Sequence, residues 1–264
     1  MNFRRRGYTP DIKLTFRLMA TIRLVLGVVA LFAAGMLLQV LHPLQQPQEY
    51  HHFADTRALW LIPNAADVLS NLFISVSGLA CLRWVSKQRK EGALLGAAIT
   101  VAGIGLLLTG VGSGFYHWHP TDARLVWDRL PMTIVFAGMV LCLWSSATLV
   151  RPRWYHALMV VAAAVGTVWF WVARGSLWPY ALLQFGGIFA MLSLVVRGRV
   201  LGASAWWKVM QWYGLAKVFE YFDKELWSWT GHLVSGHTLK HLACAGAGFA
   251  ILWLAKNSLF IPSK

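Results

Sequence analysis

The chain has 264 residues, of which 58% are hydrophobic and 13% are charged. Soluble domains carry about 25% charged residues, so this composition excludes an ordinary soluble protein and predicts a multi-pass α-helical membrane protein. The formal net charge is +14, but the basic residues lie between apolar segments, which indicates positive-inside topology and argues against nucleic-acid binding.

Apolar runs close to the ~20 residues that cross a hydrocarbon core recur along the chain. A basic N-terminal tail (1–19) precedes the first of them, whose apolar run is longer than that of a signal peptide, so we expect a retained transmembrane helix there. The predicted fold class is therefore an all-α membrane protein with eight spans. Their expected ranges are 20–41, 64–84, 92–117, 128–149, 155–173, 177–197, 204–229 and 236–256.

The span at 204–229 is the most polar of the eight, since it contains Lys217, Glu220, Asp223, Lys224 and Glu225. It is either an interfacial amphipathic helix or a span whose charged face turns into the bundle, and we favour the second reading. With eight spans, 17 of the 24 lysines and arginines fall on the side that holds both termini. This asymmetry predicts that both termini are cytoplasmic.

Polar residues recur at the opposite, non-cytoplasmic ends of several spans. Ser113 and His117 are four residues apart and share a helical face, as do His237 and His241. A pair of histidines at this spacing can present two nitrogens to one zinc ion, and His117 would supply the third. Asp128 begins the next span at the same depth, which predicts a shared site.

This set of residues suits hydrolysis. Three protein ligands with an open fourth position are typical of catalytic zinc. Asp128 can accept a proton from a zinc-activated water, and the Ser113 hydroxyl can stabilise an oxyanion.

Simpler readings remain open for each residue. Ser113 stands between Gly112 and Gly114, where small residues permit close helix packing, and it is also a possible nucleophile. Asp128 precedes Arg129 and can form an interfacial ion pair with it. The histidine pair taken alone can be a chance occurrence.

Together, Ser113, His117, Asp128 and the LPM motif at 130–132 resemble the alkaline ceramidases. These are membrane amide hydrolases of the CREST superfamily, which also contains the adiponectin and progestin receptors. The His237–His241 pair, VLSNLFISVSG (68–78) and GLAKVFEYFDKELW (214–227) are similar too, so the resemblance runs from about 64 to 256.

The resemblance implies a seven-helix hydrolase domain (64–256) that follows an extra helix (20–41) and precedes a cytoplasmic tail (257–264). It implies zinc held by His117, His237 and His241 near the non-cytoplasmic surface, with Ser113 and Asp128 beside a zinc-bound water.

One departure from the family concerns calcium. The eukaryotic ceramidases use an acidic N-terminal segment and a glutamate at the first core helix to bind calcium, whereas this chain has Asn64 at that position. Asp55, Asp67 and Asp223 remain as candidates for calcium or for structural polar roles. The loss of the glutamate argues against calcium regulation, and the chain looks closer to bacterial members of the family, which implies the bacterial inner membrane.

Three functional hypotheses follow. The first is a zinc-dependent hydrolase that acts on ceramide or another N-acyl membrane lipid. The second is a zinc-containing receptor or sensor of the adiponectin-receptor type, which fold alone does not separate from the first. The third, a haem protein, is disfavoured because His237 and His241 share one helical turn. The exact lipid and the oligomeric state are left open.

Overall fold

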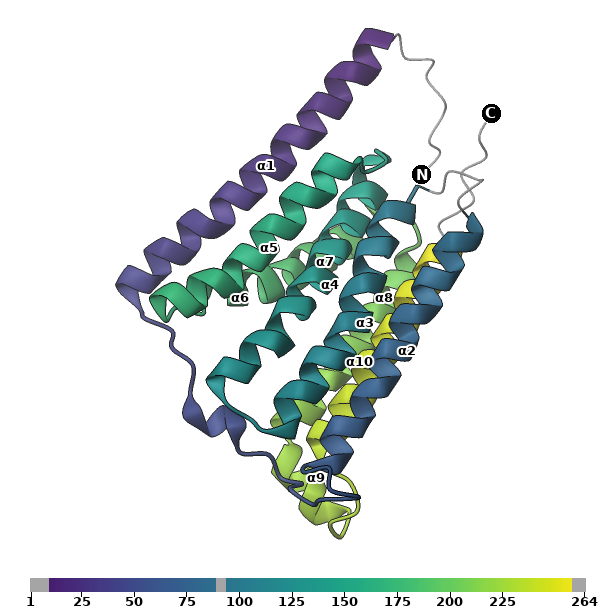
Figure 1. The fold of residues 1–264 in the computed structure, drawn as a ribbon. Coiled ribbons are helices and arrows are strands. Elements are labelled where there is room, and N and C mark those ends of the chain that lie inside the picture. The colour runs from purple at the N-terminus through teal and green to yellow at the C-terminus, as the bar shows by residue number, and fades with distance from the viewer. Residues whose placement is uncertain (1–9, 89–93, 258–264) are drawn as a thin grey trace.

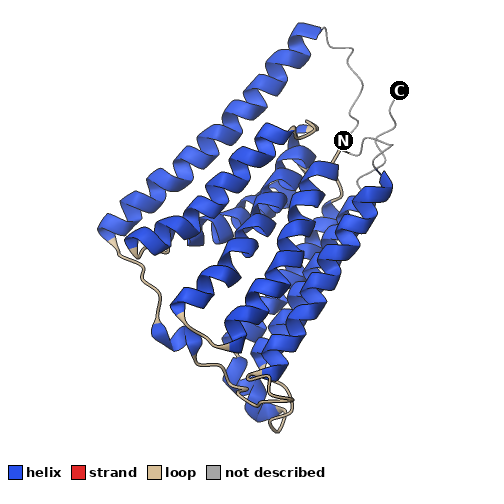
Figure 2. Cartoon of the chain, viewed as in Figure 1, coloured by secondary structure: helices blue, strands red, loops and turns tan. Residues whose placement is uncertain are grey.

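The computed structural model describes residues 10–88 and 94–257, and in this part of the chain the regular elements are helices with no strand (Figure 2). The helices that build the bundle are α1 (Pro10–Leu41), α2 (Ala65–Gln88), α3 (Gly96–Trp118), α4 (Asp122–Thr148), α5 (Trp154–Arg174), α6 (Trp178–Ala181), α7 (Gly187–Val196), α8 (Ala203–Tyr221), α9 (Asp223–Trp229) and α10 (Gly236–Asn257). A short helix, η1 (Gln48–His51), lies in the first long loop, and a π-turn, η2 (Leu182–Gly186), joins α6 to α7.

Within the described residues, seven helical segments are long and apolar enough to cross a membrane. They are α1, α2, α3, α4, α5, the continuous run 178–196 and α10. The protein is therefore an all-α, multi-pass membrane protein, as its composition predicts. The helix α8 is more polar than these seven, and it packs alongside α10 with its other face exposed (Figure 1).

Three predicted boundaries are wrong. The first helix begins at Pro10 and not at residue 20, and proline is favoured at the first helical position. The helix α4 begins at Asp122 and not at residue 128, because the Thr121 side chain caps its first turn. The expected helix at 204–229 is broken at Phe222 into α8 and α9. The Asp223 carboxylate that follows the break accepts hydrogen bonds from other segments, which fixes the chain in a turn there. Residues 1–9 and 258–264 of the predicted tails lie outside the described residues.

The packing order places α3 and α4 at the centre of the bundle and α1 at its edge (Figure 1). In the most apolar stretch of α1, 11% of the residues are buried against the rest of the protein, compared with 61% in α4. The helix α1 contacts α5 and α6, and its remaining apolar side chains face outward. Such a surface is stable only in lipid.

The close contact between α3 and α4 has a local cause. Pro131 lies inside α4 and lacks the N–H that would bond to the carbonyl of Trp127 one turn earlier. Gly112 of α3 lies against that carbonyl, and a Cβ atom at Gly112 would be 2.0 Å from its oxygen. Only glycine permits this approach, which brings the end of α3 next to the start of α4.

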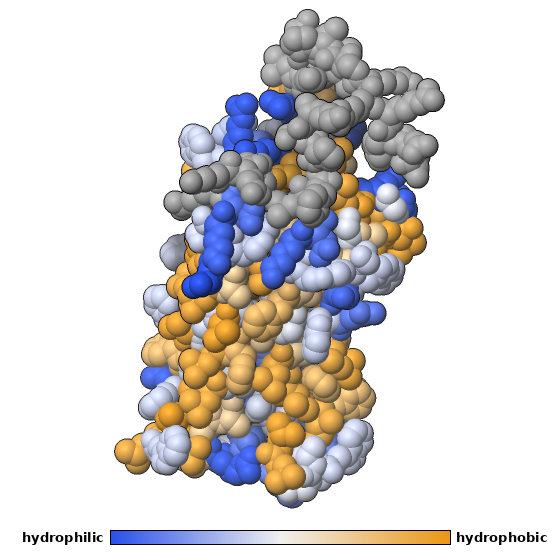
Figure 3. All heavy atoms as spheres, turned by 90° about the vertical axis from the view of Figure 1, so that its right-hand side faces the viewer, coloured by the Kyte–Doolittle hydropathy of each residue, from blue (hydrophilic) through white to orange (hydrophobic). Residues whose placement is uncertain are grey.

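The helix α3 ends where α4 and α10 begin, and α9 lies beside this end of the bundle (Figure 1). We call it the α9 end. The first and last described helices, α1 and α10, have their outer termini at the opposite end. On the face formed by α2 and α10, apolar side chains cover most of the middle, and hydrophilic ones gather toward the end where α2 terminates (Figure 3).

Candidate metal centre

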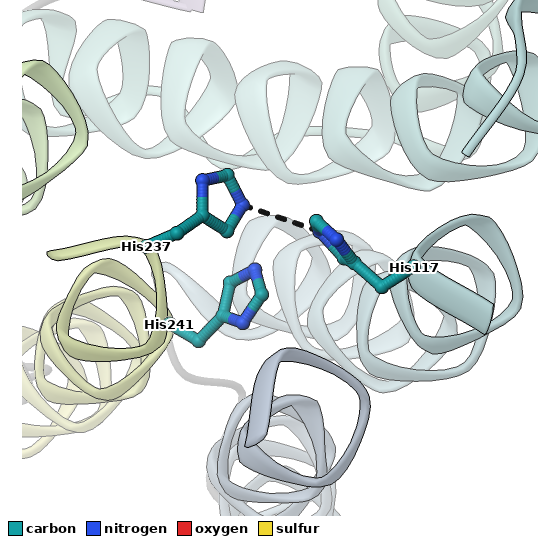
Figure 4. Close-up of side chains that lie close together, drawn as sticks. All are labelled: His117, His237 and His241. Carbon is teal, nitrogen blue, oxygen red and sulfur yellow. Dashed lines mark hydrogen bonds between the residues drawn. The ribbon is translucent and has the colours of Figure 1, made fainter. Parts of the chain in front are cut away.

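Three buried histidines meet at the α9 end, and we call them the histidine cluster. His117 comes from the last turn of α3, and His237 and His241 come from the first turns of α10 (Figure 4). Their side chains offer nitrogen atoms that all lie within 4.8 Å of one another. The three residues are 1%, 4% and 2% exposed. This confirms that the cluster can hold a metal ion.

One pair of nitrogen atoms in the cluster is close enough to share a cation. The Nε2 atoms of His117 and His237 are 3.2 Å apart, close to the separation of about 3.3 Å that zinc bonds of 2.0–2.1 Å impose on two ligands. Ser70 contacts Nδ1 of His241 at 2.8 Å, so Nε2 remains for another partner. That Nε2 is buried and has no hydrogen-bond partner in the described residues.

A loop and one carboxylate hold this arrangement together. The ring of Phe53 lies over the cluster, with its centroid 4.6 Å from that of His117 and 4.3 Å from that of His237. Asp223 accepts hydrogen bonds from the backbone N–H of Ala54 at 2.9 Å and of His237 at 2.7 Å. It therefore ties the loop between α1 and α2 to the first turn of α10.

Ser113 and Asp128 lie close to the cluster, and both are buried. The hydroxyl of Ser113 lies near the carboxyl of Asp128, and both side chains line the same cavity. Asp128 lies more than one turn inside α4, and it makes no ion pair with Arg129 within residues 94–257. The alternative of an interfacial ion pair between these two residues is therefore wrong.

The four candidates for calcium or structural roles are dispersed among different partners. Both oxygens of Asp55 bind the guanidinium of Arg57, at 2.9 and 2.7 Å, and hydrogen bonding to this carboxylate raises the pKa of Arg57. Asp67 accepts a 2.6 Å hydrogen bond from Thr238. The Asn64 amide donates to the backbone carbonyl of the cluster residue on α3.

These contacts, like those of Asp223, link α2, α3 and α10 around the histidines. The geometry thus gives all four candidates structural roles. Arg57 also donates to the carbonyls of His232 and Leu233 at 3.0 Å each, so a guanidinium lies where these oxygens and a carboxylate converge.

A largely apolar cavity opens beside the cluster. Ser113, Asp128 and His241 line its polar end, and methionine, leucine, valine and isoleucine side chains make up most of the remaining lining. Along α4 the lining extends from Asp128 to Leu143, which is about 22 Å at a rise of 1.5 Å per residue. A cavity of this length exceeds half of the ~30 Å hydrocarbon core.

Lys240 lies between the histidine cluster and a second group of charges. Its Nζ atom is 3.3 Å from Nε2 of His237 and 2.8 Å from a carboxylate oxygen of Glu220. Glu220 also pairs with Lys217 at 2.6 Å. Two of the predicted charges, those of Lys217 and Glu220, therefore turn toward α10, whereas Lys224 and Glu225 are exposed on α9.

Sequence reasoning missed the partners that surround the histidines. Ser70, Phe53 and Lys240 were not assigned to the site, although an ionisable residue such as Lys240 within an apolar span is itself a signal of function. Ser70 lies one turn after Asp67 in the same helix, which offered a weaker signal. Nothing local to Phe53 indicates that it covers the cluster.

The fold and the site define a multi-pass helical membrane protein with a buried histidine group that can hold a metal ion. No protein-family model, curated protein or solved structure matches the chain.

Proposed function

We propose that this protein is a zinc-dependent intramembrane amide hydrolase that acts on ceramide or a related N-acyl lipid. One observation carries the proposal: the cavity that Ser113, Asp128 and His241 line at one end has a largely apolar lining over the rest of its length. A lipid whose amide lies at the polar end can place its acyl chain in the apolar part. The resemblance to the alkaline ceramidases supports the same reading.

The chemistry follows from the residues at the polar end. Zinc held by the three histidines would polarise the amide carbonyl and lower the pKa of a water molecule. Asp128 accepts a proton from the attacking water, whose oxygen forms the bond to the carbonyl carbon. Asp128 then gives this proton to the amide nitrogen as the C–N bond breaks, which releases a fatty acid and an amine. The Ser113 hydroxyl lines the same cavity and can stabilise the oxyanion that forms at the carbonyl.

We further propose that the α9 end faces the non-cytoplasmic side of a bacterial inner membrane and that both termini are cytoplasmic. The excess of lysine and arginine at the opposite end supports this orientation. The helices α2 to α10 would form the hydrolase domain, with α1 as an added transmembrane helix at its edge.

Metal content and turnover measured together test the proposal. We expect detergent-purified wild-type protein to contain about one zinc per chain and to hydrolyse labelled N-acyl lipids. The variant His237→Ala should lose both, since it removes one of three ligands. His119→Ala is the matched control, because His119 is exposed at the end of α3, two residues beyond the cluster.

The outcomes separate the alternatives. Zinc binding without turnover across a broad panel of N-acyl lipids would favour the receptor of adiponectin-receptor type. Wild-type protein purified without chelators and still free of zinc would contradict the hydrolase proposal.

A further inference from the structure

A second cavity lies next to the apolar one and shares lining residues with it, among them Asp128, Met132 and Lys240. We infer that this cavity binds an anionic group, a carboxylate or phosphate, on the head group of the lipid substrate. We call it the anion pocket and define it by Arg129, Lys217, Glu220 and Lys240. The inference rests on the proposed function in that it narrows the class of N-acyl lipid to those with a negatively charged head group.

Arg129 is the main evidence for an anion. Its side chain is 6% exposed and lies among the rings of Tyr50, Trp171 and Tyr180, with Cζ 5.6, 4.5 and 5.2 Å from their centroids. One terminal nitrogen, Nη2, donates to Gln46. The other, Nη1, is buried without a hydrogen-bond partner in residues 10–88 and 94–257. A buried guanidinium N–H left unpaired is costly, and carboxylates and phosphates are its best acceptors.

The charges that line the anion pocket do not balance. Three cationic side chains, those of Arg129, Lys217 and Lys240, face two carboxylates, those of Asp128 and Glu220. Glu220 already pairs with both lysines, at 2.6 and 2.8 Å. One positive charge is therefore uncompensated at membrane depth, where unpaired charge is expensive.

The position of the pocket relative to Asp128 explains how one lipid can fill both cavities. Asp128 and Lys240 line each of them, so a lipid amide beside Asp128 has apolar space on one side and cationic space on the other. The acyl chain then occupies the apolar cavity, and the head group meets Arg129. A neutral head group would leave the guanidinium unpaired, so ceramide itself would bind less well than an acidic relative.

A matched pair of lipids tests the inference. N-acyl serine and N-acyl serinol with the same acyl chain differ in that a carboxylate replaces a hydroxymethyl group. Native mass spectrometry of the purified full-length protein counts bound intact lipid and separates it from hydrolysis products. We expect the wild type to bind N-acyl serine at least tenfold more tightly than N-acyl serinol.

Variants assign this preference to Arg129. Arg129→Gln should abolish it, and Arg129→Lys should retain part of it because the positive charge remains. Arg124→Gln is the matched control: Arg124 lies on the same helix and also stacks on a ring, that of Phe115, but it is less buried than Arg129. This control should bind the two lipids as the wild type does.

Three results would overturn the inference. They are equal binding of the two lipids by the wild type, a preference that survives in Arg129→Gln, and saturation of the pocket by inorganic phosphate with the affinity of N-acyl serine, which would identify a free anion as the occupant. Failure of the hydrolase proposal gives a different result. A protein that binds N-acyl serine selectively but forms no products would support the anion pocket and contradict the hydrolase proposal.

Discussion

The histidine cluster and the anion pocket are neighbours at the α9 end, yet their unpaired groups are opposite in kind. The cluster gathers neutral nitrogens, among them a buried Nε2 of His241 without a partner in the described residues. The anion pocket gathers cationic donors, among them a buried N–H of Arg129 that is likewise unpaired. The first arrangement suits a cation and the second suits an anion. Under the two proposals above, neighbouring polar groups in one membrane protein bind ligands of opposite charge, a metal cation and an anionic head group.

Asp128 lies between the histidine cluster and the anion pocket, and its replacement should have the largest effect of the substitutions below. Asp128→Asn should lower turnover of an N-acyl lipid by about 10²–10⁴-fold, because it removes the proton acceptor. Zinc content should stay at the wild-type value, since Asp128 is not a ligand. Asp122→Asn, an exposed change on the same helix, is the control for folding. Unchanged turnover in Asp128→Asn would remove this residue from the mechanism.

Ser70 contacts the histidine cluster and lies outside the anion pocket. Because groups that orient metal ligands typically contribute 10–100-fold to metal affinity, Ser70→Ala should weaken zinc binding by about this factor. Competition with a zinc-selective chelator measures the change. Ser86→Ala, at an exposed position of the same helix, should have no effect. The preference for an anionic head group should persist in Ser70→Ala, and its loss would show that the two regions are not separable.

Met139 lines the apolar cavity well away from its polar end. Met139→Trp should shorten the cavity and weaken binding of long-chain N-acyl serine by about tenfold, since each excluded methylene forfeits about 0.8 kcal/mol. Short-chain lipid should bind as before. Met36→Trp makes the same substitution on the exposed surface of α1. An equal loss for both chain lengths would place the acyl chain elsewhere.

Removing the charge of Lys217 changes the net charge of the anion pocket and leaves the histidine cluster intact. The Lys217 side chain is 36% exposed, so its charge contributes less than about 1 kcal/mol. Lys217→Met should therefore reduce the preference for N-acyl serine by about threefold, measured as the ratio of the two lipid affinities. Zinc content should not change. A gain in preference would contradict the excess of positive charge.

Local spacing predicted the parts of the site that belong to one helix, such as the pairs Ser113–His117 and His237–His241. Alternating topology predicted that these pairs lie at one depth. The contacts of Ser70 and Arg129 could not be predicted, because they depend on how each helix is rotated about its axis. The contact of Phe53 depends on the path of the loop between α1 and α2. Apolar residues surround most of these helices, so periodicity does not define a single inward face.

The position of Lys240 has a consequence for how the two ligands influence each other. Its ammonium group hydrogen-bonds to Glu220 and to the nitrogen of His237 that faces His117. A metal ion that takes this nitrogen removes one of the two partners of Lys240 and leaves its charge more available to the anion pocket. Under the two proposals above, cation and anion binding are thermodynamically linked. Linkage is reciprocal, so any factor by which zinc changes the affinity for the acidic lipid equals the factor by which that lipid changes the affinity for zinc.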